Sequence, residues 1–528
     1  NDLGLLSPVD ADGKFTSECG LDELVGQHVF KTNKRITEIL EEAGAMLGRE
    51  LYEHQYPHCW RSKTPIIFRA VEQFFISLKD IRGKALEEID KVEWLPKWGR
   101  NRIYGTVESR PDWCISRQRT WGVPLPVFFD KNGEAIISTE LIAKVADLVE
   151  CEGTNIWFEL DDAELAARLG LPEGCTKCRD TLDVWIDSGS SHVAVMDRHP
   201  ELSTPADLYL EATDQHRGWF QSSLMLSVAA RGAAPYKAVM THGFVVDTSG
   251  KKISKSGSKP INAKHYYDQF GSDIVRLWAA SVDWQTEVPF SDKLFKQVTD
   301  PYRRLRNTLR ILLGNINGFD ASTQSVSKEE MTLLDRWVLE RLNGVISECS
   351  KAYDAYQFRK VFNEINQFCA HELSALYIDI TKDRMYCDAL DSKRRLAAQT
   401  VMHRVFDAVC RLIAPILAFT ADEAWEHAGN EGSIHEQDFP VVDPDFQSGE
   451  AVAQIDVLLE LRAVIQTAIE KEVQSKAFNK NNEAHVTVAL PENHPSRELL
   501  ADRDFVTECF ILADLQLEPG SEITATAK

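Results

Sequence analysis

Residues 206–220 read ADLYLEATDQHRGWF, an apolar run that passes through an acidic and polar turn into a helical pattern. The run predicts a strand, and the spacing after it predicts a helix over 219–231. Strands and helices alternate on both sides of this stretch, which favours a parallel sheet with a doubly wound topology. We therefore expect an α/β domain in this part of the chain.

Polar side chains follow the predicted strand where it ends, which is the edge at which open α/β sheets bind their ligands. Glu211 and Asp214 suit ribose hydroxyls or an ammonium group. The unpaired amide hydrogens of the helix start near Gln215 and His216 can receive negative charge. Residues 180–190 (DTLDVWIDSGS) show the same pattern, and here too we expect a strand that runs into a polar turn.

A lysine and serine segment, GKKISKS at 250–256, follows the apolar run AVMTHGFVV at 238–246. The run predicts a buried strand or hairpin. The ammonium and hydroxyl groups of the segment suit a polyanion, because they can fold over a triphosphate and neutralise charge as a phosphorus–oxygen bond breaks. In isolation such a loop is more often a solvated turn.

Two stretches between 56 and 126 combine aromatic and polar residues. Residues 56–70 (YPHCWRSKTPIIFRA) predict two strand-like pieces, either a wall that faces a ligand or an aromatic edge strand. Residues 110–126 (RPDWCISRQRTWGVPLP) place three arginines beside two tryptophans, a set that can contact phosphates and stack on flat groups. A helical pattern at 35–47 precedes both stretches.

From about residue 300, glycine and proline become sparse and apolar residues recur at helical spacing, which predicts a helical bundle. The clearest candidate helices lie within 333–346, 358–369 and 401–413. We interpret the aromatic and cysteine side chains on these faces as core. Further on we expect a linker, a helix over 457–473, a strand over 486–490 and a polar, frayed tail.

Composition limits the class of protein. With 528 residues the chain has room for roughly two to four domains, and no apolar run approaches the length of a membrane span. The net charge of -22 argues against a general nucleic-acid coat protein, so any nucleic-acid contact must be local. Eleven cysteines without a short-spaced framework fit a reducing cytosol. Cys175 and Cys178 form a C-x-x-C, but a zinc site needs four ligands and no second close pair exists, so structural zinc is not expected.

Together these stretches resemble the class I aminoacyl-tRNA synthetases, most closely the isoleucyl-tRNA synthetases. Residues 250–256 are similar to the family's K-M-S-K-S loop, with Ile253 in the methionine position, although GSKP at 257–260 departs from the usual glycine–asparagine pattern. RQRTWG at 117–122 and DVWIDSG at 183–189 resemble the isoleucyl members more than the valyl or leucyl ones. Residues 58–69 resemble the segment where the chain re-enters the catalytic fold after the editing insertion.

The resemblance implies that ATP and Mg2+ are used to activate L-isoleucine, which is then transferred to tRNA(Ile), with editing of valine in the full-length parent. By analogy, Lys252 and Lys255 would stabilise the pyrophosphate. Trp185 and Trp219 would wall the side-chain pocket. The implied contacts to nucleotide and adenylate are Glu211, Asp214, Gln215, His242, Ser254 and Ser256. The implied tRNA contacts are Arg303, Arg304, Arg306 and Arg310.

The resemblance also predicts a division of the chain. Its parts would be the trailing edge of the editing insertion (1–50), the second half of a Rossmann-type catalytic domain (51–299), a helical anticodon-binding domain (300–435), and a linker with the start of a small α+β region (436–528). The family's His-x-Gly-His signature is absent from the sequence, so we expect a C-terminal fragment that is inactive alone. We expect a cytoplasmic monomer without membrane association. The alternatives are a non-catalytic tRNA-binding relative and a valyl- or leucyl-tRNA synthetase.

Overall fold

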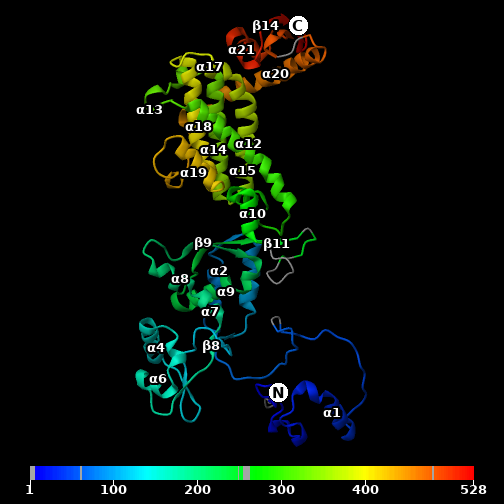
Figure 1. The fold of residues 1–528 in the computed structure, drawn as a ribbon, viewed down its shortest axis with the longest axis vertical. Helices are drawn as coiled ribbons and strands as arrows, with labels where there is room; N and C mark the ends of the chain where they lie inside the picture. Colours follow the sequence, from blue (N-terminus) through cyan, green and yellow to red (C-terminus); the bar gives the residue numbers. More distant parts are fainter. Residues whose placement is uncertain (1–5, 60–61, 248, 252, 254–261, 478–480) are drawn as a thin grey trace. The chain divides into compact units, whose positions relative to one another are not determined.

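The computed structural model describes residues 6–59, 62–247, 249–251, 253, 262–477 and 481–528. The chain forms two compact units, Asn1–Thr241 and His242–Lys528. Figure 1 labels many of the helices and some of the strands. The architecture is mixed α/β in the first unit and mainly helical in the second, as the sequence predicted.

A three-stranded sheet forms the centre of the first unit. Its order is β2-β10-β9, and β2 and β10 run parallel. The predicted strand and helix are found at the expected bounds, as β9 (Ala206–Ala212) and α9 (Trp219–Arg231). Leu224, Val228 and Val239 belong to one core in which helices and strands pack together. The remaining elements of this core are β2 (Glu93–Leu95), β10 (Tyr236–His242), α2 (Arg82–Ile89) and α3 (Trp98–Glu108).

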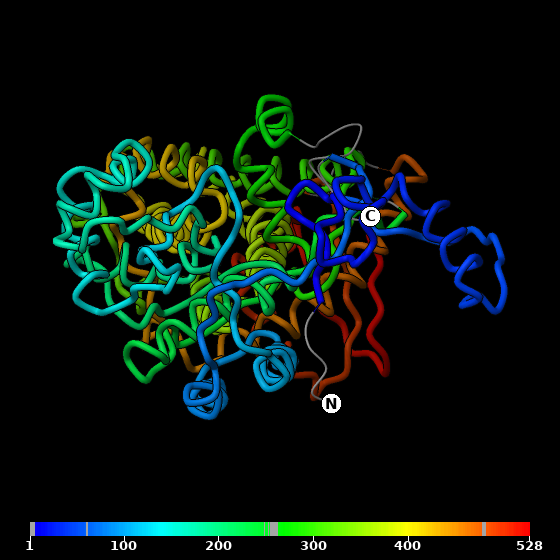
Figure 2. Tube along the Cα trace, turned by 90° about the horizontal axis from the view of Figure 1, so that it is seen from below, coloured from blue at the N-terminus to red at the C-terminus, as the bar shows by residue number. Residues whose placement is uncertain are grey.

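Between α3 and β9 lies a smaller subdomain with its own core around Phe128 and Trp157. Its antiparallel sheet has the order β6-β5-β7. The helices α4 and α6 lie side by side in both Figure 1 and Figure 2. The bounds are β5 (Phe128–Phe129), β6 (Ala135–Ile136), α4 (Thr139–Glu152), α5 (Ile156–Glu159), α6 (Asp162–Leu169) and β7 (Thr176–Lys177).

Two predictions for the beginning of the chain need correction. The two strand-like pieces at 56–70 are not strands; among the described residues there, only an isolated bridge joins His58 and Pro65. In the described part of this stretch the side chains pack against no strand and are largely exposed. The helix predicted at 35–47 is α1 (Val29–Glu42), which His28 caps by accepting a hydrogen bond from the Phe30 amide. It ends early because Gly44 follows in the left-handed region at φ 65°.

The second unit begins with a parallel strand pair and continues as a helical bundle. The three predicted apolar faces lie on α14, α15 and α18, and Val338, Ile365 and Val405 on them are fully buried. The bounds of these elements are β11 (Val245–Val246), α10 (Ala263–Phe270), α11 (Ser272–Ser281), β12 (Val288–Pro289), α12 (Asp292–Ile316), α14 (Leu333–Asp354), α15 (Phe358–Gln367), α18 (Lys393–Ile413) and α19 (Ala418–His427). A π-helix over Phe368–Tyr377 continues α15.

The C-terminal region is an ordered α+β module, so the frayed tail predicted after residue 490 is wrong. The predicted helix and strand are α20 (Glu450–Gln474) and β13 (His485–Leu490). After β13 come α21 (Arg503–Phe510), β14 (Asp514–Pro519) and β15 (Thr524–Ala527). β14 pairs parallel and β15 antiparallel with β13, and both edges of β13 are thereby covered. The buried side chains of Leu515 and Ala527 give these strands a packed face.

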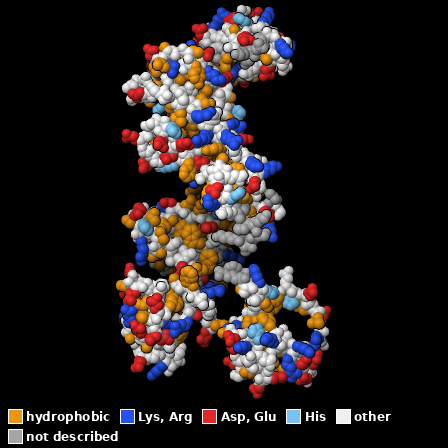
Figure 3. All heavy atoms as spheres, in the orientation of Figure 1, with side chains coloured by type: hydrophobic (Ala, Val, Ile, Leu, Met, Phe, Trp, Pro, Cys, Tyr) orange, Lys and Arg blue, Asp and Glu red, His pale blue; other side chains and the backbone are white. Residues whose placement is uncertain are grey.

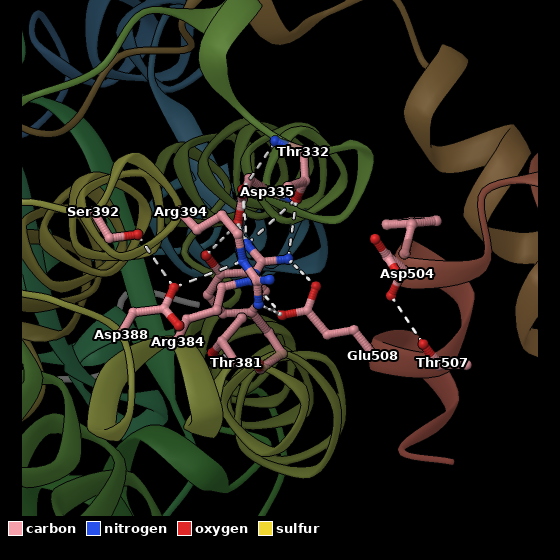
Figure 4. Close-up of polar contacts among 12 residues, drawn as sticks. Thr332, Asp335, Thr381, Arg384, Asp388, Ser392, Arg394, Asp504, Thr507 and Glu508 are labelled. Atoms are coloured by element: carbon pink, nitrogen blue, oxygen red, sulfur yellow. Dashed lines mark hydrogen bonds and ion pairs between the residues drawn. The ribbon is translucent and has the colours of Figure 1, made fainter. Parts of the chain in front are cut away.

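A buried ion-pair network ties this module to the bundle (Figure 4). Arg384 is fully buried, and its guanidinium contacts Asp335 of α14 at 3.1 Å and Glu508 of α21 at 2.6 Å. The Tyr377 hydroxyl donates to Asp335 at 2.7 Å. Asp335 also forms the capping box of α14 with Thr332. One carboxylate therefore both starts a helix and fixes a buried cation.

No helix in the described part of the chain is both long enough and apolar enough to span a membrane.

Candidate functional site

The first group of predicted site residues lies between β9 and α9. A 3-10 turn over Thr213–Arg217 connects the two elements. Glu211 and Asp214 are exposed, and one oxygen of the Glu211 carboxylate accepts a hydrogen bond from the Ala212 amide at 2.9 Å. The Gln215 side chain accepts from the Trp219 amide at 2.9 Å. Because Gly218 has no side chain to cap α9, Gln215 satisfies one of the free amides at the start of that helix.

The two tryptophans predicted to wall the pocket come from neighbouring helices. Trp219 stacks on Tyr209, with ring centroids 4.1 Å apart, and its indole donates to the Ser188 carbonyl at 2.9 Å. Trp185 is 38% exposed. Its ring lies so close to Gly218 that a Cβ there would approach it to 2.7 Å. The Trp185 ring thus lies against Gly218, the residue directly before Trp219.

The prediction for residues 180–190 needs correction. β8 (Thr181–Leu182) is a strand of two residues, and the expected polar turn is helix α7 (Val184–Gly189). Asp183 caps this helix by accepting from the Trp185 amide at 3.3 Å, which is the usual role of an N-cap carboxylate. Gly189 allows α7 to pack on α9, because a Cβ there would lie 2.9 Å from the Ser222 backbone.

Replacing Gly218 with alanine is expected to displace Trp185 or Gln215, because the new Cβ would lie 2.7 Å from the ring and 2.6 Å from the amide oxygen. Overpacking of this kind costs about 1 to 3 kcal/mol. Urea denaturation measures the loss. Gly105→Ala is the matched control, since nothing lies near its Cβ position within α3 and alanine there should stabilise the helix. Equal stability of the two variants would contradict this packing.

The side chain of His216, just before the start of α9, is part of the core. It is fully buried between Trp94, Trp98 and Phe220. Its Nδ1 lies 3.0 Å from the Thr213 carbonyl, which can only accept, so Nδ1 carries the proton. Nε2 has no partner in the described part of the structure. Burial lowers the pKa of His216, so the ring stays neutral.

This burial predicts a pH dependence of stability. Because the folded pKa lies below the ordinary value of about 6.5, the unfolded chain binds more protons as the pH falls below that value. His216 should therefore cost up to about 1.4 kcal/mol of stability between pH 7.5 and 5.5. When urea denaturation is measured at both pH values, the free energy of unfolding should change less between them in His216→Asn than in the wild type. The exposed His199→Asn serves as control, and an unchanged difference in His216→Asn would refute the account.

The second group of predicted residues belongs to the second unit. His242 ends β10, and its Nδ1 lies 2.8 Å from the Gly243 carbonyl. Lys252, Ser254, Lys255 and Ser256 lie outside the described residues. The apolar run 238–246 is not one strand: it breaks at Gly243, where a Cβ would lie 1.9 Å from the Thr286 carbonyl oxygen.

Asp247 forms a hydrogen-bonded turn where the lysine segment begins. Its carboxylate accepts from the Ser249 hydroxyl at 2.6 Å and from the Lys251 amide at 3.0 Å. These hydrogen bonds, that of the Ser249 hydroxyl foremost, lower the pKa of Asp247. The Ile253 amide donates to the Val245 carbonyl at 3.1 Å, which returns the chain to β11. The segment therefore starts from a hydrogen-bonded turn.

The four arginines proposed for tRNA lie on α12 and are exposed. Arg303, Arg306 and Arg310 line one hollow together with Glu423 and His427 of α19. Arg306 pairs with Glu423 at 2.6 Å, while Arg304 does not line the hollow. Side chains of both signs are interspersed over the face of the bundle in Figure 3. Any contact with a polyanion there depends on individual arginines.

Cys175 and Cys178 are buried in two neighbouring cores of the small subdomain. Burial raises the pKa of the Cys178 thiol. Among the residues that the structure describes, no group of three or more His, Cys, Asp or Glu side chains is placed to hold a metal ion.

Sequence reasoning missed Gln221. This side chain of α9 is 2% exposed and binds the Arg110 guanidinium through its amide oxygen. The 110–126 stretch was predicted to contact phosphates, but the glutamine that completes the pair lies 111 residues away in sequence. No local pattern marks it, because its role depends on burial.

Two family models match the chain. The model described as tRNA synthetases class I (I, L, M and V) matches residues 18–291, and the anticodon-binding domain of tRNA ligase matches residues 335–488.

Curated relatives match over nearly all of the chain. The isoleucine–tRNA ligase of Methylacidiphilum infernorum is 45% identical over 523 residues, which cover 98% of this chain and 57% of that protein. The isoleucine–tRNA ligase of Carboxydothermus hydrogenoformans is 42% identical over 540 residues, with 99% and 57% covered. The chain thus spans a little over half the length of these relatives. Among solved structures, the methionyl-tRNA synthetase of Mycobacterium tuberculosis bound by methionyl-adenylate is 18% identical, with 75% of this chain and 68% of that chain covered and a TM-score of 0.47.

Proposed function

The chain belongs to the class I tRNA synthetases, and we propose that within this family it forms the catalytic and anticodon-binding portions of an isoleucine–tRNA ligase. The observation that carries the proposal is the 45% identity, over 98% of the chain, to a protein named for that activity. The segments 117–122 and 183–189, which resemble the isoleucyl members, support the same choice of amino acid.

In the proposed reaction the carboxylate of L-isoleucine attacks the α-phosphate of ATP, so that isoleucyl-adenylate forms and pyrophosphate leaves. The isoleucyl group then passes to tRNA(Ile). Lys252 and Lys255 offset the charge that develops on the pyrophosphate, with Ser254 and Ser256 as hydroxyl donors. Catalysis of this kind comes from positioning and electrostatics. The turn closed by Asp247 supports the role, because it fixes the point from which the lysines start.

The proposed adenylate contacts are the residues that the family resemblance implies. In the first unit, Glu211 and Asp214 offer exposed carboxylates for ribose hydroxyls or the amino group, and Gln215 lies between them and α9. His242 is the proposed contact from the end of β10. Mg2+ is usually bound by one or two carboxylates together with substrate phosphates, so these exposed oxygens fit it without a preformed cage. When bound, the ion would neutralise phosphate charge.

Trp185 and Trp219 are the proposed walls of the isoleucine pocket. Their support is the shared turn at Gly218, which holds both rings near the start of α9. An apolar pocket distinguishes one methylene by only about 1 to 3 kcal/mol, so discrimination against valine calls for editing in the full-length enzyme.

For tRNA we propose contacts from Arg303, Arg304 and Arg310 of α12, with Arg306 contributing once its pair with Glu423 opens. Phosphate contacts from a few arginines allow a protein of net charge -22 to bind RNA locally.

The test is amino-acid-dependent ATP–pyrophosphate exchange by the full-length protein, with isoleucine, valine and leucine offered separately. Strong exchange with isoleucine and weaker exchange with valine is the expected result. If valine or leucine gives the strongest exchange, the protein is a valyl- or leucyl-tRNA synthetase. A folded protein without exchange that still binds tRNA would instead be a non-catalytic relative.

A further inference from the structure

A cavity of about 470 Å³ lies in the first unit between the loop after α3 and the start of α9. Its lining combines basic, amide and aromatic side chains. They include Arg110, Trp113, Asp183, Trp185, Arg217 and Gln221.

Arg110 is a half-buried cation without a carboxylate partner among the described residues. Its guanidinium lies 4.8 Å from the centroid of the Trp113 ring and donates to the Gln221 amide oxygen. Burial lowers the pKa of Arg110, and the negative charge of Asp183 acts in the opposite direction.

The carboxylates near the cavity are already engaged. Asp183 accepts from Arg117 at 2.8 Å and from the Trp113 indole at 3.0 Å, and it also caps α7. Asp112 accepts from the Leu78 amide at 2.9 Å. Neither one forms an ion pair with Arg110, so the positive charge stays available to a ligand.

Gln221 supplies a second free donor. Because a guanidinium can only donate, the amide oxygen must face Arg110 and the NH2 group is left over. That Nε2 is buried and has no partner in the described structure. Buried donors are normally satisfied, so an unpaired one beside an unpaired cation indicates a missing acceptor. Arg217 adds an exposed guanidinium to the lining.

We propose that this cavity binds a phosphate group, held by Arg110, the Gln221 amide and Arg217. Guanidinium groups pair well with phosphate oxygens, and a phosphate offers enough acceptors for three donors at once. The indoles of Trp113 and Trp185 add flat surfaces that suit a base attached to the phosphate. Trp185 is also a proposed wall of the isoleucine pocket, but the phosphate contacts themselves rest on Arg110, Gln221 and Arg217 and do not require the proposed ligase activity.

Calorimetric titration of the chain with inorganic phosphate, at constant ionic strength set with chloride, tests the site. Saturable binding is expected. Arg110→Gln should weaken it at least tenfold, whereas Arg100→Gln should not, because Arg100 is a partly exposed residue of α3 that does not line the cavity and pairs with Asp90. Gln221→Glu should also abolish phosphate binding, since the new carboxylate would pair with Arg110. That variant should keep its fold, so loss of binding cannot be attributed to unfolding.

Two further ligands identify the source of the phosphate. If AMP binds at least tenfold more tightly than inorganic phosphate, the ligand is a nucleotide. If a short single-stranded oligoribonucleotide shows the same gain in affinity, the ligand is an RNA backbone. Equal affinities would assign the phosphate group alone. The proposal is overturned if phosphate gives no more heat than chloride, if Gln221→Glu binds like wild type, or if acetate binds more tightly than phosphate. None of these readouts uses the exchange reaction, so the two proposals can fail separately.

Discussion

Replacing Arg384 with alanine should lower the free energy of unfolding of the chain by about 3 to 5 kcal/mol. The residue is fully buried, and Asp335 beside it is buried as well. Without the guanidinium, the buried Asp335 would lose the cation it pairs with, and Glu508 would keep only the half-exposed Arg394 at 2.9 Å. Removing one partner of a buried pair leaves the full desolvation penalty of the other uncompensated.

Urea denaturation followed by circular dichroism measures this loss, and hydrogen exchange locates it on α14 and α21. The control is Arg306→Ala, which removes an ion pair whose side chains are about half exposed and should cost less than about 1 kcal/mol. Adding Asp335→Asn and Glu508→Gln to Arg384→Met should recover part of the stability, because the buried charges are then gone. Similar losses for Arg384→Ala and Arg306→Ala would refute the network as described.

Lys255→Ala in the full-length enzyme is expected to slow adenylate formation at least tenfold and to leave tRNA affinity nearly unchanged. One charge-assisted hydrogen bond contributes about 1.5 to 3 kcal/mol, which corresponds to roughly a tenfold to 150-fold change in rate. The proposed contact forms with the leaving pyrophosphate, so its loss should appear in the chemical step.

Single-turnover formation of adenylate, monitored by rapid quench, separates this step from substrate binding. Lys264→Ala is the matched control: Lys264 is an exposed lysine of α10 that pairs with Asp268, and its removal should leave the rate unchanged. If Lys255→Ala activates isoleucine at the wild-type rate, the proposed role of the loop is wrong.

The fold could be predicted best where one pattern was long and consistent. β9 and α9 have the predicted bounds because an apolar strand, a polar turn and a helix follow one another without ambiguity. The bundle helices were recognised because apolar residues recur at helical spacing over many turns, as on α14 and α18. The family resemblance predicted the same order, an α/β domain followed by a helical bundle.

The failures occurred where the deciding interaction is tertiary or very short. α7 has only six residues, too few for a period, and one N-cap from Asp183 is enough to start it. The strands β14 and β15 are held by pairing with β13, which no local pattern reveals. The burial of His216 also depends on tertiary packing, against Trp94, Trp98 and Phe220.

The same distinction applies to the candidate site. Trp185, Glu211 and Trp219 could be chosen because their neighbours in sequence form recognisable blocks. The approach of both Trp185 and Gln215 to Gly218 could not be predicted, since it depends on how α7 packs against α9. No sequence pattern marks Gln221, because the feature that distinguishes it, a buried amide with an unpaired donor, depends on the tertiary structure.

The π-helix over Phe368–Tyr377 bears on how the bundle can change in length during evolution. A π turn holds more residues than an α turn, so this segment carries surplus residues for the distance it spans. A relative that lacks one of them could rewind the turn as α-helix and keep the flanking helices in place. Because Tyr377 is the last residue of the segment, a relative that lacks Tyr377 itself would also lose the hydroxyl that donates to Asp335 in the buried network.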